Sequence, residues 1–85
     1  MTITYSKDFI KQAERLQPKL QIKLYENILL YQKDPFNPRL RNHQLKGKYK
    51  QYRSIDVTGD YRALYLQSGN EVIFDIVGTH SQLYS

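Results

Sequence analysis

The spacing of apolar residues changes at the segment DPFNP, residues 34–38, and this change divides the chain into two halves. Before it, apolar side chains recur every three or four residues, as they do along one face of a helix. After it, they alternate or run together, as they do in strands. The two prolines stop the preceding helix and make the segment a rigid turn. The sequence therefore predicts helices followed by strands.

The first half of the chain predicts one short strand and two helices. Residues 2–5, TITY, alternate β-branched and aromatic side chains, which is typical of a strand. Ser6 can cap a helix that has Asp8 in its first turn, and Pro18 fits the first turn of a second helix. The apolar positions at helical spacing are Phe9, Ile10, Ala13, Leu16, Leu20, Leu24, Ile28 and Tyr31, with Tyr25 and Leu29 widening the stripe. The tight junction at residues 17–18 predicts an antiparallel helical hairpin.

The second half predicts an antiparallel meander. Residues 53–57 alternate, TGD at 58–60 is a tight turn in which Gly59 is free to adopt a positive φ, and residues 61–67 return. Residues 71–78 are apolar on both faces apart from Asp75 and predict the central strand, and the segment after Gly78 is too short for more than one helical turn. The expected fold is α+β: a single domain, residues 1–85, with the helical hairpin packed on one face of a small antiparallel sheet and the other face left open.

The net charge of +5 is concentrated in one part of the chain. No acidic residue lies between Asp34 and Asp56, and the rest of the sequence is close to neutral. The cations in this interval are Arg39, Arg41, Lys46, Lys48, Lys50 and Arg53. Such a patch favours a polyanion such as nucleic acid. The alternative is a solvated loop and strand edge that keep the protein soluble.

The composition also excludes several classes of protein. The chain has no cysteine, so a disulfide framework is impossible and a reducing compartment suits it. Two histidines and scattered carboxylates make a poor set of metal ligands, and no cofactor is expected. No apolar run approaches the ~18 residues of a membrane span. The N-terminus lacks the pattern of a secretion signal. We therefore expect a cytoplasmic protein with no membrane association.

The strand half contains every group needed to cut RNA without a metal. A base removes the proton of the 2′-OH, an acid protonates the leaving 5′-oxygen, and cations stabilise the charge on phosphorus. The candidates are His43, Asp56, Asp60, Arg62, His80 and Tyr84. Structural interpretations remain open: Asp60 as a turn former, Asp56 as a solvated residue, Arg53 in a structural ion pair, and the strand tyrosines as packing residues.

Two motifs resemble a known family. The segment HQLKGKYKQYRSIDVTGDYRALYL, residues 43–66, and GTHSQLY, residues 78–84, are similar to the RelE superfamily of bacterial type II toxins, and specifically to its YafQ-like branch. The helical half and the DPFNPRL linker also match. The resemblance implies a ribosome-dependent mRNA endonuclease that cuts the codon in the A site without a metal. It also implies a co-expressed antitoxin that neutralises the toxin, commonly as a heterotetramer.

The resemblance assigns roles to particular residues. The family's site positions fall on His43, Asp60, Tyr61, His80 and Tyr84. Asp56 is a departure, because some YafQ-like toxins carry a histidine there, and Arg62 matches the arginine of more distant RelE relatives. We expect His80 to be the general acid and His43 or Asp60 the base, with the reverse order and Asp56 as base also open. Phosphate and RNA contacts are expected from Lys46, Lys48, Lys50, Arg39, Arg41, Arg53 and Arg62, and base stacking from Tyr61 and Tyr84.

Two other functions are compatible with this resemblance. ParE-like toxins share the fold but inhibit DNA gyrase, and the retained histidines and GDYR turn argue against them here. A non-catalytic binding module is the second alternative, and the departure at Asp56 keeps it open.

Overall fold

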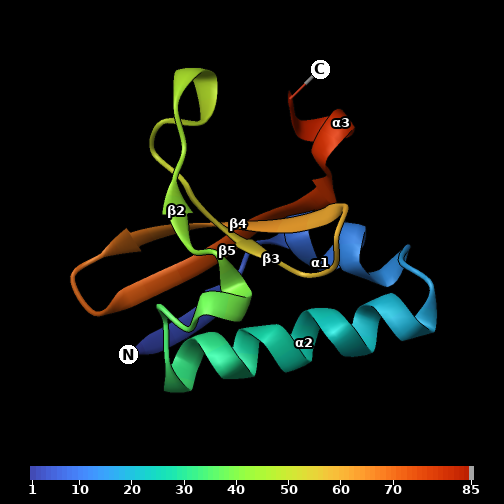
Figure 1. Ribbon diagram of the computed structural model, residues 1–85, viewed down its shortest axis with the longest axis horizontal. Helices are drawn as coiled ribbons and strands as arrows, with labels where there is room; N and C mark the ends of the chain where they lie inside the picture. Colours follow the sequence, from blue (N-terminus) through green and yellow to red (C-terminus); the bar gives the residue numbers. More distant parts are fainter. Residues whose placement is uncertain (85) are drawn as a thin grey trace.

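A five-stranded sheet with the strand order β1-β5-β4-β3-β2 forms the centre of the computed structural model, which describes residues 1–84 and the side chains of residues 1–83 (Figure 1). The strands are β1 (Thr2–Tyr5), β2 (His43–Gln44), β3 (Arg53–Asp56), β4 (Tyr61–Ser68) and β5 (Glu71–Thr79). The helices are α1 (Lys7–Glu14), α2 (Pro18–Lys33) and α3 (His80–Tyr84), and two short 3₁₀ turns are η1 (Pro38–Leu40) and η2 (Gly47–Tyr49). The α+β class is confirmed.

The predicted helix boundaries are confirmed by the local hydrogen bonds. The Ser6 hydroxyl accepts a hydrogen bond from the backbone N–H of Phe9 at 3.0 Å and so caps α1, with Asp8 in the first turn. Pro18 is the first residue of α2, and Asp34 is its C-cap. The chain thus stops α2 at the Asp34–Pro35 step because proline disfavours helical backbone in the residue before it.

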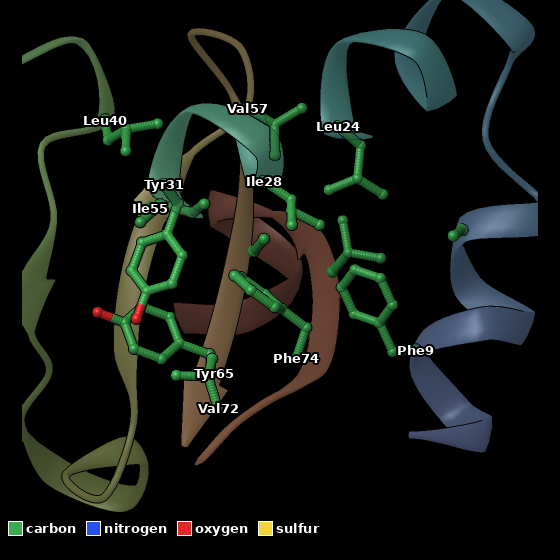
Figure 2. Close-up of a cluster of buried hydrophobic side chains, with 13 residues drawn as sticks. Phe9, Leu24, Ile28, Tyr31, Leu40, Ile55, Val57, Tyr65, Val72 and Phe74 are labelled. Atoms are coloured by element: carbon green, nitrogen blue, oxygen red, sulfur yellow. The ribbon is translucent and has the colours of Figure 1, made fainter. Parts of the chain in front are cut away.

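Both α1 and α2 pack on the same face of the sheet, as predicted (Figure 2). Tyr65 of β4 lies at the centre of this core, with ring centroids 4.8 Å from Tyr31 of α2 and 5.3 Å from Phe74 of β5. The other buried members are Phe9, Ala13, Leu24, Ile28, Leu40, Ile55, Val57, Ala63, Val72 and Val77. Ile10, Tyr25 and Leu29, which were predicted to belong to the apolar stripes, remain exposed at its margins.

The sheet differs from the prediction in three details. Strand β1 pairs parallel with β5, because the chain crosses over through both helices before it forms the meander; the remaining pairs are antiparallel. β5 is an interior strand, but the middle position belongs to β4, which has β3 and β5 as hairpin neighbours. Gly59 does not adopt a positive φ; among the described glycines, Gly47 and Gly69 do.

The second face of the sheet is partly covered by the chain itself. The segment between β2 and β3, which contains η2, projects from this face, and α3 projects beside it (Figure 1). A small cluster of Leu45, Leu64 and Leu83 joins these two projections to the sheet, with Tyr49, Tyr52 and Ile76 packed around it. The face predicted to be open is therefore a cleft between two projections of the same chain.

Candidate active site

An open cleft of about 460 Å³ lies on this second face, between β2 and the start of α3. It brings together the only two histidines of the sequence, His43 and His80. The remaining lining residues are Arg41, Gln44, Leu45, Lys46, Asp56 and Arg62. Six of the residues singled out from the sequence therefore meet in one cleft, although they come from β2, β3, β4, α3 and the segments after η1 and β2.

His43 is oriented by a backbone carbonyl. Its Nδ1 lies 2.7 Å from the carbonyl oxygen of Arg41. Because a carbonyl oxygen can only accept a hydrogen bond, Nδ1 carries the hydrogen, and in the neutral ring the lone pair lies on Nε2. His43 is exposed, and its strand is held by antiparallel pairing of His43 with Ser54 of β3. This arrangement leaves a proton acceptor on the cleft side of β2.

His80 is placed by a capping box at the start of α3. The Thr79 hydroxyl accepts from the backbone N–H of Gln82 at 3.1 Å, and the Gln82 side-chain oxygen accepts from the backbone N–H of Thr79 at 2.9 Å. The N–H of His80 donates to the carbonyl oxygen of Asp60 at 2.9 Å, which ties α3 to the β3–β4 turn. Gly78 leaves room for the cap, since a Cβ there would lie 3.1 Å from the Gln82 oxygen. The contacts within the GTHSQL motif therefore fix the position of His80.

Asp56 is paired with two arginines and is largely shielded from solvent. It lies opposite Arg62 in the antiparallel β3–β4 register, on the cleft face. Its Oδ2 accepts a hydrogen bond from Nε of Arg41 at 2.6 Å, and its Oδ1 lies 3.0 Å from Nε of Arg62 in an ion pair. The side chain is only 14% exposed. Two guanidinium groups thus pair with the carboxylate, which corrects the interpretation of Asp56 as a solvated residue.

Arg62 is largely committed to contacts within the protein. Its Nη1 donates to the carbonyl oxygens of Thr58, Gly59 and Tyr61 at 3.1–3.2 Å, and its side chain is only 11% exposed. These bonds hold the turn at residues 58–61, in which the carbonyl oxygen of Asp60 accepts a hydrogen bond from the N–H of His80. Arg62 lines the cleft, but most of its donors hold the site together.

Two of the predicted RNA contacts lie on the helix-covered face instead. Arg53 has the same parity as Ile55, and its Nε donates to the Asn42 side-chain oxygen at 3.0 Å while its guanidinium lies 5.4 Å from the centre of the Phe36 ring. Tyr61 is half-buried and packs against the main core. Strand alternation places both side chains away from the cleft. Tyr61 is a packing residue, as its structural interpretation states, whereas Arg53 makes a hydrogen bond and a ring contact in place of the expected ion pair.

Other predicted contacts do not line the cleft. Lys48, whose ammonium lies 5.2 Å from the centre of the Tyr49 ring, and Lys50 belong to the projecting β2–β3 segment, and Arg39 lies on η1. The exposed Asp60 contributes its backbone to the His80 contact, and its carboxylate is absent from the cleft lining as described. The side chain of Tyr84 lies outside the described part of the chain.

Hydrogen bonds also fix the projecting segment that carries one wall of the cleft. The Tyr52 hydroxyl donates to Oδ2 of Asp75 at 2.5 Å, which fastens the end of the segment to β5. This hydrogen bond, together with burial, raises the pKa of Tyr52 to about 12. The Gln44 amide donates to the carbonyl oxygens of Lys50 and Tyr52. These contacts, and the capping box of α3, were missed by reasoning from the sequence, although the T-x-x-Q spacing of Thr79 and Gln82 was a readable signal.

Neither a membrane segment nor a metal-binding group is found in the described chain. Within residues 1–84, no helix is both long and apolar enough to cross a bilayer. The same residues contain no group of three or more His, Cys, Asp or Glu side chains that could hold a metal ion. The cleft offers instead two imidazoles, a lysine and two arginines to a ligand.

A family model described as "Bacterial toxin of type II toxin-antitoxin system, YafQ" matches residues 1–85. The chain belongs to the YafQ toxin family. The resemblance noted from the motifs at residues 43–66 and 78–84 is thereby confirmed, and so is the assignment to type II toxin–antitoxin systems.

Individual relatives and solved structures agree with this assignment. The mRNA interferase toxin YafQ of Escherichia coli K12 is 28% identical over 80 residues, which cover 94% of this chain and 87% of that protein. A crystal structure of a copper-bound L66S mutant toxin from Helicobacter pylori is 30% identical, with a TM-score of 0.72 and 99% of each chain covered. YafQ in the E. coli DinJ–YafQ toxin–antitoxin complex is 25% identical, with a TM-score of 0.69 and coverage of 98% of this chain and 96% of that one.

Proposed function

We propose that this YafQ-family toxin is an mRNA endonuclease that cuts the message in the ribosomal A site by general acid–base catalysis. The observation that carries the proposal is the meeting of His43 and His80 in one cationic cleft. An imidazole can act as a general base or as a general acid, so two imidazoles in one cleft supply both groups that the reaction needs. The name of the E. coli relative, mRNA interferase toxin, supports the same activity for this chain.

In the proposed reaction His43 is the general base and His80 the general acid. Nε2 of His43 takes the proton of the 2′-OH, and the resulting oxygen attacks the adjacent phosphorus. The bond from phosphorus to the 5′-oxygen breaks, and His80 gives that oxygen a proton. The products are a 2′,3′-cyclic phosphate and a 5′-OH, with no water consumed. The orientation of His43 by the Arg41 carbonyl favours it as the base over Asp60, the other candidate.

The cations of the cleft stabilise the charge that develops on the phosphorane. Lys46, Arg41 and Arg62 line the same cleft as the two histidines. Cations fixed in place before the reaction lower the barrier, because they need no reorganisation as charge develops. The chemistry that these residues supply is complete without a metal or a cofactor.

We also propose the partners expected of such a toxin. A cognate antitoxin would bind the toxin, and the E. coli toxin–antitoxin complex supports such a partner by homology. The antitoxin would cover the cationic cleft, in a heterotetramer of two toxins and two antitoxins. The ribosome and its message would be the substrate complex, and the cytoplasm the site of action. The absence of acidic residues between Asp34 and Asp56 favours contact with ribosomal RNA.

Mapping transcript ends on a translated message tests this function. The wild-type toxin should create new 5′ ends in ribosome-bound mRNA. His80→Ala should reduce their rate of appearance by ~10²–10⁴, the usual cost of losing one proton-transfer group. Ser81→Ala is a matched control, because Ser81 is an exposed neighbour on α3 that does not line the cleft. Equal rates for wild type and His80→Ala would refute the assignment.

The same preparation separates the two alternative functions. A ParE-like toxin would leave the message intact and inhibit supercoiling by DNA gyrase. A non-catalytic binding module would sediment with its partner without either activity. New 5′ ends that depend on His80, with normal supercoiling, are the result that the cleft predicts.

A further inference from the structure

Arg41 has an unusual backbone for its residue type. At φ 44° and ψ 47° it is left-handed, and among the described residues no other non-glycine has a positive φ. This conformation costs roughly 1–2 kcal/mol for a residue with a Cβ, so the surrounding contacts must maintain it. Two of those contacts belong to the cleft: the Arg41 carbonyl accepts from His43, and its Nε donates to Asp56. Strained residues that persist in this way cluster at functional sites.

The two arginines at Asp56 differ in what they leave available to a ligand. Arg62 is 11% exposed and has Nη1 bonded to three backbone carbonyls. Arg41 is 65% exposed, and its Nε is bonded to Asp56 while its two Nη groups make no hydrogen bond within the described chain. The Asp56 bond therefore anchors one end of the Arg41 guanidinium and leaves the terminal fork facing the cleft and solvent.

From these contacts we infer that Arg41, rather than Arg62, binds the scissile phosphate, and that Asp56 is the residue that positions it. The inference rests on the proposed nuclease function and names the cation that this function requires. A guanidinium held at Nε offers its parallel Nη hydrogens to two phosphate oxygens, which is the geometry that arginine provides and lysine does not. Arg62 instead pairs with Oδ1 of Asp56 and donates hydrogen bonds that hold the 58–61 turn.

This arrangement couples the phosphate site to the base. The carbonyl of Arg41 orients His43, and the side chain of the same residue holds the phosphate. The left-handed backbone at residue 41 therefore fixes the imidazole relative to the fork. The departure from histidine at position 56 also receives an explanation, because a carboxylate can hold two guanidinium groups and an imidazolium would repel them.

The test removes the guanidinium without disturbing the backbone. Arg41→Gly keeps a residue that tolerates the left-handed conformation, and circular dichroism would verify its fold. Its single-turnover cleavage of ribosome-bound message should fall by about 10²–10³, and millimolar guanidinium ion should restore part of the rate. Arg15→Gly, at the end of α1 and outside the cleft, removes the same charge and should cleave as wild type does. Arg41→Lys keeps the charge but should stay at least tenfold slow, because it lacks the fork.

The role of Asp56 in positioning the guanidinium group is tested by chemical rescue, which a purely structural role would not affect. In the double variant Arg41→Gly/Asp56→Asn, guanidinium ion should no longer restore activity, since the anchor that holds it is gone. Rescue equal to that of Arg41→Gly alone would refute the role of Asp56. Cleavage by Arg41→Gly within twofold of wild type, or a loss that guanidinium does not relieve, would overturn the role of Arg41.

A binding measurement keeps this inference separate from the proposed function. Inorganic phosphate, titrated into the ¹⁵N-labelled wild-type toxin, should shift the Nε–Hε signal of Arg41 more than that of Arg62. A larger shift at Arg62, or no shift at Arg41, would overturn the inference. If the wild type cut no message, the nuclease function would fail, and this titration would still decide whether Arg41 is the anion-binding group.

Discussion

Leu83→Ala should disable the site by releasing α3 while leaving the main core intact. Leu83 is 5% exposed and is the one buried side chain among the described residues of α3. It packs with Leu45 and Leu64, in a cluster separate from the core under α1 and α2. His80 begins the same helix, so its position depends on this anchor.

The size of the effect follows from the burial of Leu83. Truncating a buried leucine costs about 2–5 kcal/mol, and we expect about 2–3 kcal/mol because the cluster is small and has half-buried tyrosines that can relax around the gap. Such a loss shifts the balance between docked and undocked α3 by roughly 30- to 150-fold. The cleavage rate should fall at least about tenfold, because a helix of one turn with a single buried side chain has little docking energy in reserve.

The assay compares two leucines that have the same chemistry and lie on different faces. Leu24 of α2 is fully buried in the main core, so Leu24→Ala should cost more stability than Leu83→Ala in urea unfolding. At a low temperature where both variants are folded, Leu24→Ala should cleave ribosome-bound message near the wild-type rate and Leu83→Ala should not. Wild-type cleavage by folded Leu83→Ala would show that docking of α3 does not position His80.

Three further predictions concern the cationic wall, alkaline stability and one buried amide. Lys46→Ala should weaken ribosome co-sedimentation and reduce the slope of log affinity against log salt concentration by about one, because Lys46 lines the cleft. Lys48→Ala should have a smaller effect, because Lys48 lies over a tyrosine ring. The raised pKa of Tyr52, about 12, means that the unfolded chain loses this proton first; the free energy of unfolding should decline as pH rises from about 10 towards 12, and less steeply in Tyr52→Phe, as urea titrations would measure. Asn27→Ala should cost about 1–3 kcal/mol in the same titrations, because the Asn27 amide donates to the carbonyl oxygens of Asp56 and Val57 at 2.8 and 3.1 Å.

The helices α1 and α2 and the strands β1, β3, β4 and β5 could be predicted from the sequence, because their signals are local, but the two-residue strand β2 was not predicted. The hydroxyl of Ser6, the position of Pro18 and the change of spacing at Asp34 each act within one turn of chain. The pairing of β1 with β5 was not predicted, because it joins residues at opposite ends of the sequence and depends on a crossover through both helices.

The candidate site was predicted better in the residues that meet there than in their contacts. The two motifs singled out His43 and His80, which the structure brings into one cleft, but the contacts of Asp56 depend on strand register and on a left-handed residue at position 41. Neither the register nor the left-handed backbone can be predicted from the local spacing of residues, since arginine seldom adopts a positive φ. Alternation along β3 did carry the signal that places Arg53 on the core face.

The chemistry of the cleaved RNA ends tests the central claim most directly. The message would be cut by the wild-type toxin on the ribosome, and both new ends would be characterised by enzymatic labelling and mass spectrometry. Attack by the 2′-OH under the control of His43 and His80 predicts a 5′-OH on one fragment and a 2′,3′-cyclic phosphate, or its 3′-phosphate hydrolysis product, on the other. A message with a 2′-deoxy nucleotide at the cut position should stay intact. Fragments with a 5′-phosphate and a 3′-OH, or cleavage at the deoxy position, would contradict the proposed mechanism.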